Sequence, residues 1–376
     1  MSAPPLHWVG SWATSLQSTE PANQPPAPGL SGNTLRQVIR CSLGGPRARF
    51  QFSNLFGSGA LTLERVRCAL AADGHAIVAS SDRALTFSGE SSVTIPPGQF
   101  VHSDALDFEL EAHTRLAVSV HFGLVAEPIS GHPGSRTTSY LQAGDAASAP
   151  SLDSAVSIDQ WYVLSGLEVL PASASAALVA LGDSITDGRG STTNHNDRWT
   201  DALSLRLRQH PRTRQVAVLN AGIGGNHVLR GGLGPCARQR FERDVLQAAG
   251  ARWLLLLEGV NDIGTGEPAV AGELIEAFRR FVGQARQHGL RAYGGTILPF
   301  GGSQYDTPTN EQARQLVNEW IRTPGNFDAL VDFDAAVRNP HAPHTLVAEY
   351  DCGDHLHLSP QGYRAMADAV ELSLFY

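Results

Sequence analysis

The hydrophobic pattern of this chain changes near the middle of its 376 residues. Before residue 171, apolar residues recur with the two-residue period of β-strands. After residue 177, short apolar runs alternate with helical patterns. The stretch between them, 171–177 (PASASAA), consists mainly of small residues and is typical of a linker. Because one hydrophobic core stops growing at about 250–300 residues, a chain of this length is expected to build two domains.

The first half is predicted to be an all-β sandwich of jelly-roll type at 31–170, preceded by an N-terminal strap at 1–30. The clearest strand is 115–122, in which alternate residues are apolar and share one face. Further runs of this kind, separated by Gly, Pro and Asp clusters, occur at 49–52, 84–87, 107–110 and 161–170. The strap is Pro-rich toward its end, which favours an extended segment, and Trp8 and Trp12 are expected to dock it.

The second half is predicted to be an α/β domain at 171–376. Strands are expected at 177–181, 216–219, 252–257, 292–298 and 330–333. Helices are expected at 198–209, 237–249, 270–288, 311–321 and 361–374, the last with Ser359 as its N-cap. Alternating strands and helices form βαβ units, in which a parallel sheet is buried on both faces. The order of elements predicts a flavodoxin-like, doubly wound sheet of five strands.

The charged residues exclude several classes of function. The chain has 36 acidic and 28 basic residues and a net charge of −8, so it lacks the basic footprint that nucleic acid or anionic lipid requires. Every basic residue is arginine, which excludes chemistry that needs lysine, such as a P-loop or a Schiff base. No run approaches the ~20 apolar residues of a membrane span, and Met1–Leu6 shows no secretory signal.

Polar, Gly-rich loops follow three of the predicted strands, at 181–188, 220–226 and 258–262, and a fourth polar segment at 351–357 precedes the last helix. Each loop alone fits ordinary turn or capping chemistry. In an open α/β sheet, however, loops at the carboxyl ends of the strands meet at one edge and form the site. Together they predict an active site at that edge.

These loops supply the groups that acyl transfer needs. Ser184 is the candidate nucleophile, and His357 is the candidate base that accepts its proton. Asp354, three residues before His357, can reach the other ring nitrogen and fix its tautomer. The oxyanion of the tetrahedral intermediate needs fixed donors. The backbone N–H groups of Ser184 and Gly225 and the side-chain amide of Asn261 are the candidates.

The same motifs resemble the SGNH hydrolase (GDSL esterase/lipase) superfamily. The resemblance is carried by 182–185 (GDSI), Gly225, Asn261 and 354–357 (DHLH), which occur in the family's order and spacing. It implies a serine nucleophile, an oxyanion hole completed by the Gly and the Asn, and a triad completed by the Asp and the His. The segments 7–13 (HWVGSWA) and 34–38 (TLRQV) resemble the two-domain bacterial subgroup, which carries a β-sandwich ahead of the hydrolase domain.

The resemblance also implies an activity. It predicts a serine esterase that hydrolyses short-chain acyl esters, with acetyl groups on carbohydrate or small alcohols as the leading substrates, through an acyl-enzyme and without a metal or other cofactor. A lipid-directed lysophospholipase or thioesterase is the alternative. A secreted or periplasmic location and a pocket-shaping β domain are further expectations. Two positions depart from the family pattern, Ile185 for Leu and Leu358 for the Pro that commonly follows the catalytic His.

Other hydrolase and binding motifs fit less well. The Gly-x-Ser-x-Gly elbow of α/β-hydrolases is excluded because Thr186 occupies the place of its second Gly. A dinucleotide site at 222–225 fails because His227 stands at the third Gly position. A zinc hydrolase would leave Ser184 without a role. Its candidate ligands are Asp351, Asp354, His355, His357, His341 and His344.

The remaining candidates surround this centre. His227 and His355 are predicted to line or buttress the pocket. Arg189 and Trp199, which follow the nucleophile loop, are predicted to shape the acyl or alcohol pocket, with core packing as the alternative for Trp199. The sequence is compatible with two states of the four cysteines, free thiols or two disulfides. The disulfide reading pairs Cys236 with Cys352 and Cys41 with Cys68.

Overall fold

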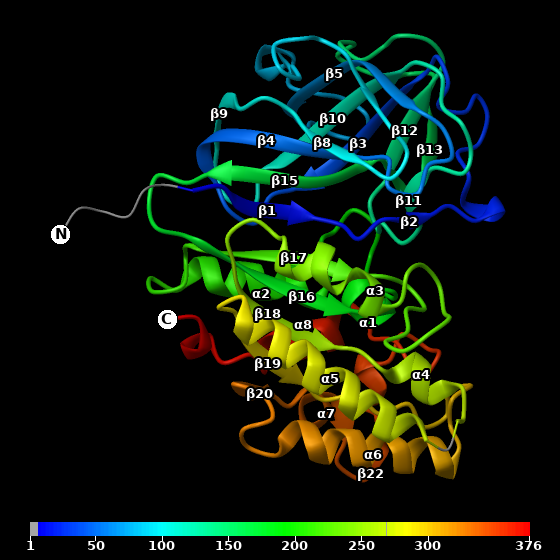
Figure 1. The fold of residues 1–376 in the computed structure, drawn as a ribbon, viewed down its shortest axis with the longest axis vertical. Coiled ribbons are helices and arrows are strands. Elements are labelled where there is room, and N and C mark those ends of the chain that lie inside the picture. The colour runs from blue at the N-terminus through cyan, green and yellow to red at the C-terminus, as the bar shows by residue number, and fades with distance from the viewer. Residues whose placement is uncertain (1–6, 268) are drawn as a thin grey trace. The chain divides into compact units, whose positions relative to one another are not determined.

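The computed structural model describes residues 7–267 and 269–376. Met1–Leu6, where the sequence predicts no secretory signal, lies outside the described residues. The chain divides between Ala174 and Ser175 into two compact units (Figure 1), and each is described by itself. Within the described residues, no helix is long and apolar enough to cross a membrane.

The first unit is an all-β sandwich of antiparallel strands. A five-stranded sheet has the order β1-β15-β4-β8, with β9 also paired to β4. Its strands are β1 (Val9–Ala13), β4 (Gly45–Ser53), β8 (Phe100–His102), β9 (Leu106–Leu110) and β15 (Leu164–Leu170). A seven-stranded sheet has the order β13-β12-β3-β10-β5-β6, with β7 also paired to β5. Its strands are β3 (Thr34–Arg40), β5 (Leu61–Leu70), β6 (Arg83–Ala84), β7 (Val93–Ile95), β10 (Arg115–Phe122), β12 (Ser139–Gln142) and β13 (Val156–Ile158).

Smaller elements complete this unit. A three-stranded sheet has the order β14-β11-β2, and two 3-10 turns, η1 and η2, lie between strands. These elements are β2 (Gln17–Ser18), β11 (Ser130–His132), β14 (Trp161–Tyr162), η1 (Pro21–Asn23) and η2 (Ala79–Ser81).

The predicted strand 115–122 is confirmed as β10, and three other predictions in this unit need correction. Part of the expected strap is a sheet strand, since β1 pairs with β15 and Trp12 packs edge-on against Trp161 with ring centroids 5.0 Å apart. The strand expected at 84–87 stops at Ala84, after which the chain makes only an isolated bridge. The run 161–170 is divided by Val163, whose positive φ of 66° turns the backbone between β14 and β15.

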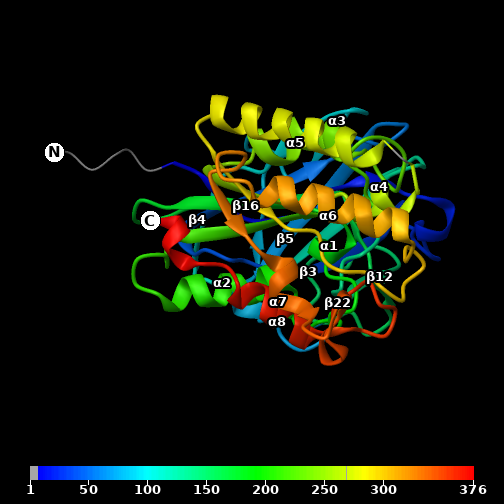
Figure 2. The same cartoon turned by 90° about the horizontal axis from the view of Figure 1, so that it is seen from below.

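The second unit is built around a parallel five-stranded sheet of order β17-β16-β18-β19-β20, as the α/β prediction requires. Its strands are β16 (Ala176–Gly182), β17 (Val216–Gly222), β18 (Ala251–Leu257), β19 (Arg291–Gly295) and β20 (Ala329–Val331). The central strand β16 is buried from Ala177 onward on both faces, because helices cover both sides of the sheet. Figure 2 shows α3 and α5 on one side of this sheet and α2, α7 and α8 on the other.

The helices agree with the prediction where the apolar pattern repeats over several turns. They are α1 (Ser184–Asp187), α2 (Trp199–Gln209), α3 (Ala237–Phe241), α4 (Val260–Gly264), α5 (Val270–Gln287), α6 (Pro308–Arg322), α7 (Phe333–Val337) and α8 (Pro360–Asp368). Short additions are the π turn η3 (Glu242–Leu246), the 3-10 turns η4 (Ala348–Tyr350) and η5 (Leu372–Phe375), and the hairpin of β21 (Arg338–Asn339) and β22 (Ala342–Leu346).

Two boundaries differ from the prediction for local reasons. The strand expected to reach Phe333 ends at Val331, because the side chain of Asp332 caps α7 by accepting a hydrogen bond from the backbone of Ala335. Ser359 caps α8 as predicted, but that helix ends at Asp368 and a separate 3-10 turn follows.

Candidate active site

The nucleophile loop is a tight turn from β16 into α1. Asp183 is the N-cap of α1, and its Oδ1 accepts a hydrogen bond of 2.9 Å from the Ile185 backbone. The turn requires glycine at 182, since an added Cβ would lie 2.1 Å from Thr186 Oγ1. Ser184 is therefore fixed as the first residue of α1, at the carboxyl end of the central strand.

The structure joins Ser184, His357 and Asp354 by hydrogen bonds. Ser184 Oγ lies 2.7 Å from His357 Nε2, and His357 Nδ1 lies 2.7 Å from Asp354 Oδ2. Partial burial opposes the charge of Asp354, but hydrogen bonds from the backbone and ring of His357 outweigh it and lower the pKa of this carboxyl far below its usual value. With Asp354 ionised, Nδ1 carries the ring proton, and Nε2 is the acceptor that faces Ser184.

Two further loops bring donors to the same edge. Gly225 follows β17 with a positive φ of 68°, and Asn261 lies on α4 after β18. Among the described residues, no acceptor takes the backbone N–H of Ser184 or of Gly225. Asn261 Nδ2 donates to the Asn226 backbone oxygen at 2.9 Å, and none of the described residues accepts its second hydrogen. The loops after β16, β17 and β18 thus carry three N–H donors for which the described residues provide no acceptor.

The loop that carries Gly225 is held by α4. Asp262, directly after Asn261, accepts hydrogen bonds from the backbones of Val228 at 2.8 Å and Leu229 at 2.9 Å. Together with the Asn261–Asn226 bond, these contacts fix the loop after β17 to the loop after β18.

A buried arginine on α3 connects the same strand ends. Arg240 is fully buried and donates to the backbone oxygens of Gly182 at 2.9 Å and Ala221 at 2.6 Å. It also donates to Asn226 Oδ1 at 3.0 Å and to Glu258 Oε1 at 3.2 Å. One guanidinium therefore contacts the ends of β16 and β17, the residue after β18 and the loop that contains Gly225.

Three buried carboxyl groups lie around this arginine and the nucleophile loop. Burial, the largest cause, raises the pKa values of Asp183, Glu258 and Asp262. Repulsion from Asp262 adds to the shift of Asp183, repulsion from Asp183 adds to that of Glu258, and the charge of Arg240 opposes both. Glu258 Oε2 is buried and has no hydrogen-bond partner among the described residues, which fits a protonated carboxyl group.

Sequence reasoning missed Arg240 and Tyr305, both of which contact site residues. Tyr305 lies in the loop between β19 and α6, and its hydroxyl is 3.0 Å from Asn261 Oδ1. The available signal was the polar, Gly-rich run 301–307 (GGSQYDT), which follows the fourth strand as similar runs follow the first three.

The predicted pocket residues lie in different surroundings. Trp199 is fully buried and packs on Phe333 with ring centroids 5.4 Å apart, so its prediction as a pocket residue is wrong and the core alternative holds. Arg189 is largely exposed, with its Nε 3.9 Å from Asp354 Oδ2. His355 has a positive φ and pairs with Asp351 at 2.6 Å.

His227, one of the predicted pocket residues, lines a cavity. Its Nδ1 lies 3.3 Å from the Gly225 backbone oxygen, and the cavity measures about 130 Å³. The other lining residues are mostly polar: Leu229, Arg230, Asp262, Thr265, Glu267, Val270 and Glu273.

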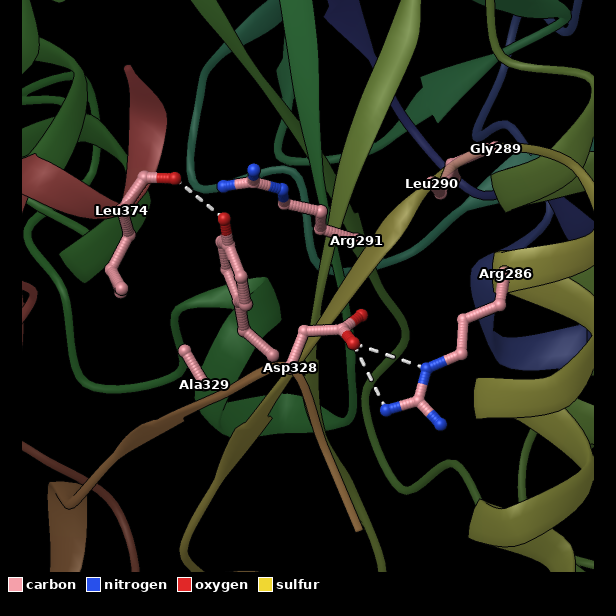
Figure 3. A pocket seen from close by; sticks show the side chains of 8 residues that line it. Arg286, Gly289, Leu290, Arg291, Asp328, Ala329 and Leu374 are labelled. Carbon is pink, nitrogen blue, oxygen red and sulfur yellow. Dashed lines mark hydrogen bonds and ion pairs between the residues drawn. The ribbon is translucent and has the colours of Figure 1, made fainter. Parts of the chain in front are cut away.

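A larger cavity, of about 360 Å³, lies at the opposite edge of the sheet (Figure 3). Arg291 and Ala329, which line it, begin β19 and β20, whereas the site loops follow the carboxyl ends of the strands. Figure 3 shows the paired side chains of Arg286 and Asp328 at its wall.

All four cysteines are free thiols, so the disulfide reading is corrected. Cys41 follows β3 and Cys68 lies in β5, and β10 runs between these strands. Residues two strands apart are separated by about 9–10 Å, too far for a disulfide. Cys236 is buried with its Sγ 3.6 Å from the Leu229 backbone oxygen, whereas Cys352 is exposed.

The residues considered as zinc ligands are divided among other contacts. Asp354 and His357 bond each other, and His357 also contacts Ser184. Asp351 bonds His355, and its carboxylate, Cys352 Sγ and an oxygen of Asp354 lie within 4.8 Å of one another.

Comparison with known proteins identifies a family for the second unit. The profile described as the GDSL-like Lipase/Acylhydrolase family matches residues 180–365, which include every loop of the candidate site. No curated protein matches the chain.

Several solved structures are similar to about half of the chain. A G-D-S-L family protein from Desulfitobacterium hafniense DCB-2 is 19% identical, with 52% of this chain and 97% of that chain covered and a TM-score of 0.42. A carbohydrate acetylesterase family member from Sinorhizobium meliloti is 17% identical, with 53% and 97% covered and a TM-score of 0.42. An acetylxylan esterase from Geobacillus stearothermophilus is 22% identical, with 52% and 91% covered and a TM-score of 0.39. Residues 180–365 therefore form a GDSL-like lipase/acylhydrolase family domain, and the protein is a carboxylic ester hydrolase.

Proposed function

We propose that this protein is a serine esterase in which Ser184, His357 and Asp354 form the catalytic triad. The supporting observation is the continuous pair of 2.7 Å hydrogen bonds that links the three side chains. A serine hydroxyl is a weak nucleophile until a base accepts its proton. Here the ring nitrogen that faces Ser184 is the one left free to accept, because the Asp354 carboxylate holds the proton on the other nitrogen.

The reaction proceeds through an acyl-enzyme. Ser184 Oγ attacks the ester carbonyl carbon while His357 Nε2 takes its proton. The C–O bond to the alcohol breaks as the imidazolium returns that proton to the leaving oxygen. Water then attacks the acyl-enzyme by the same route and releases the carboxylic acid and free Ser184. Asp354 stays ionised throughout and stabilises the imidazolium.

The negative oxygen of each tetrahedral intermediate is held by three donors in this proposal. They are the backbone N–H groups of Ser184 and Gly225 and the second hydrogen of Asn261 Nδ2. Donors that are fixed before the reaction stabilise the developing charge without reorganisation, and each typically lowers the barrier by about 2.7–4 kcal/mol. The contacts of Asp262 and Arg240 keep the loops that bear these donors in place.

The proposed substrates are short-chain acyl esters, with acetyl groups on carbohydrate or small alcohols as the leading class. The family resemblance suggests this class.

A labelling experiment tests the nucleophile. A fluorophosphonate probe should attach to the wild-type protein, and Ser184→Ala should lose both labelling and ester turnover. Ser191→Ala is the matched control, because that hydroxyl lies in the following loop and donates to the Gly188 backbone instead of a histidine. Continued labelling of Ser184→Ala at another residue would refute the assignment.

A substrate series tests the proposed class. kcat/KM should be highest for acetyl and propionyl p-nitrophenyl esters and should fall as the acyl chain lengthens, and acetylated sugars should release acetate. A maximum at long chains or with lysophospholipid would instead establish the lipid-directed alternative.

A further inference from the structure

We propose that Tyr305 is a positioning residue for the reaction, and that its hydroxyl holds the side-chain amide of Asn261 with one N–H turned toward the oxyanion. This inference rests on the proposed role of Asn261 as an oxyanion donor. It adds a residue that lies outside the family motifs, on the loop after β19.

The hydrogen bonds of Asn261 determine which way its amide faces. The group opposite Nδ2 is the Asn226 backbone oxygen, 2.9 Å away, which can only accept. The atom that faces it must therefore be the nitrogen, and the atom 3.0 Å from the Tyr305 hydroxyl must be Oδ1. An amide oxygen only accepts, so the Tyr305 hydroxyl is the donor. One amide hydrogen remains, and it is available to a substrate oxygen.

Tyr305 is itself fixed in place. Its backbone N–H donates to Ser303 Oγ at 3.1 Å, and its backbone oxygen accepts from Asn310 Nδ2 at 2.9 Å. Its ring lies against Gly264 on α4, where an added Cβ would approach the ring to 2.6 Å. Burial raises the pKa of the Tyr305 hydroxyl, so it keeps its proton at every pH at which an imidazole base works.

The opposite end of the amide is also anchored. Asn226, whose backbone oxygen accepts from Asn261, has its side-chain oxygen bound by the buried guanidinium of Arg240 at 3.0 Å. Its side-chain nitrogen donates to the backbones of Leu233 at 2.9 Å and Pro235 at 3.0 Å. Loss of the Tyr305 hydroxyl removes the one hydrogen bond that Asn261 Oδ1 receives within the described part of the chain. The amide is then held at one end alone, by its bond to the Asn226 backbone oxygen. It can twist about that bond and turn its second hydrogen away from the oxyanion.

Loss of the Tyr305 hydroxyl should raise the energy of the transition state more than that of the bound substrate. The substrate carbonyl carries little charge before attack, so a misdirected amide has a small effect on ground-state binding and a large effect on the intermediate. Removal of one oxyanion donor costs 10²–10³-fold in kcat in a well-studied protease, and loss of its orientation should cost part of that. We therefore expect Tyr305→Phe to lower kcat by about 10–100-fold and to change KM by less than about 2-fold.

Steady-state kinetics on p-nitrophenyl acetate and the inhibition constant of phenylboronic acid test the proposal. The boronate forms a tetrahedral adduct on the serine, so its affinity should fall by the same factor as kcat/KM in Tyr305→Phe. Tyr293→Phe is the matched control, because that hydroxyl donates to the Leu374 backbone oxygen in the same unit, at 2.5 Å. It should leave both quantities within about 2-fold.

A double-mutant cycle separates this inference from the proposed function. In an Asn261→Ala background, Tyr305→Phe should have no further effect, because its target is gone. An equal loss in both backgrounds, or unchanged kcat in Tyr305→Phe when Asn261→Ala alone is impaired, would overturn the positioning role and leave the oxyanion assignment intact. Unchanged kcat in Asn261→Ala would overturn the oxyanion assignment itself, and the inference with it.

Discussion

Two aspartates three residues apart on one loop have different partners. Asp354 bonds His357 Nδ1 at 2.7 Å, and Asp351 bonds His355 Nδ1 at 2.6 Å. His357, the histidine that Asp354 bonds, contacts Ser184, whereas the side chain of His355 is more than half exposed, at 56%. Position on the loop, and not residue type, separates the proposed catalytic aspartate from its neighbour.

We predict that Asp354→Asn lowers kcat by about 10⁴-fold, as the equivalent change does in a serine protease, because the amide would stabilise the wrong tautomer of His357. Asp351→Asn is the matched control. Its side-chain oxygen can still accept from the backbones of Gly353 and His355, so kcat should stay within about 3-fold. Initial rates on p-nitrophenyl acetate at saturating substrate check both. Equal losses in the two variants would remove Asp354 from the triad.

At the scale of residues, the sequence predicts groups that belong to a spaced motif and misses those that act through a neighbour. Ser184 and His357 are 173 positions apart, and the spacing of family motifs was enough to pair them. Tyr305 and Arg240 belong to no such motif, because they contact the site through hydrogen bonds that depend on the tertiary fold. The same limit explains Trp199, whose burial against Phe333 depends on a helix 134 positions away.

Among the elements, α3 has a role that its length does not suggest. This five-residue helix carries Arg240, which contacts the ends of β16 and β17 and the residue that follows β18. A second guanidinium in the same unit, Arg314 on α6, is equally buried but binds carboxylates of Glu311 and Asp334 outside the site loops.

We predict from this pair that Arg240→Lys lowers kcat by at least about 10-fold in the folded protein, since an ammonium group cannot reproduce the planar fork of a guanidinium that spans several acceptors. Arg314→Lys should lower stability without this loss of kcat. Kinetics normalised to the folded fraction, measured by circular dichroism, distinguish the two. Equal kcat in both variants would mean that Arg240 contributes to folding stability and not to catalysis.

The buried carboxyl groups around α3 predict a pH dependence of stability. Because the pKa of Glu258 is raised well above its usual value, the native state binds a proton that the unfolded state has released once the pH exceeds about 4.3. Raising the pH through this interval therefore favours unfolding, by at most about 1.4 kcal/mol per pH unit for each such group.

Urea unfolding between pH 5 and 7.5 should show this loss in the wild type, and Glu258→Gln should make the slope shallower. Glu276→Gln, on the exposed face of α5, removes a carboxyl group outside the cluster and serves as the control. Identical slopes in wild type and Glu258→Gln would contradict a protonated Glu258.

Long elements with a regular period were predictable, and short ones were not. The helix expected at 270–288 is α5 within one residue, because its apolar face repeats over five turns. The helix expected at 237–249 is instead a short α3 followed by a π turn, and α4 forms where the sequence predicts a loop. Elements of about five residues make few internal hydrogen bonds, so tertiary contacts and not local pattern decide them.

For the whole molecule, the chain divides into two compact units that meet in sequence between Ala174 and Ser175. Residues 172–174 are exposed and carry small side chains, whereas the flanking strands β15 and β16 are largely buried. We propose on this basis that 31–170 and 171–376 are separate domains. The sequence supported this division because a linker and a change of period coincide, but it could not reveal that 9–13 forms a strand of the first unit.

We predict that elastase, which cuts after small residues, cleaves a fluorophosphonate-labelled chain first within 172–174. The label should remain on the C-terminal fragment, which contains Ser184. Replacement of Ala172 and Ala174 by Glu should slow this cleavage, and mass spectrometry of the fragments locates it. A first cut inside β16–β20 would contradict the proposed boundary.

The exposure of a single thiol gives this enzyme a natural point of attachment for a spectroscopic reporter. Three cysteines are buried, and Cys352 stands in solvent two residues from Asp354. A maleimide dye added to the folded protein would couple at that position while the shielded sulfurs stay unmodified. Its emission would follow movements of the segment that bears the proposed base during each turnover, without an engineered cysteine.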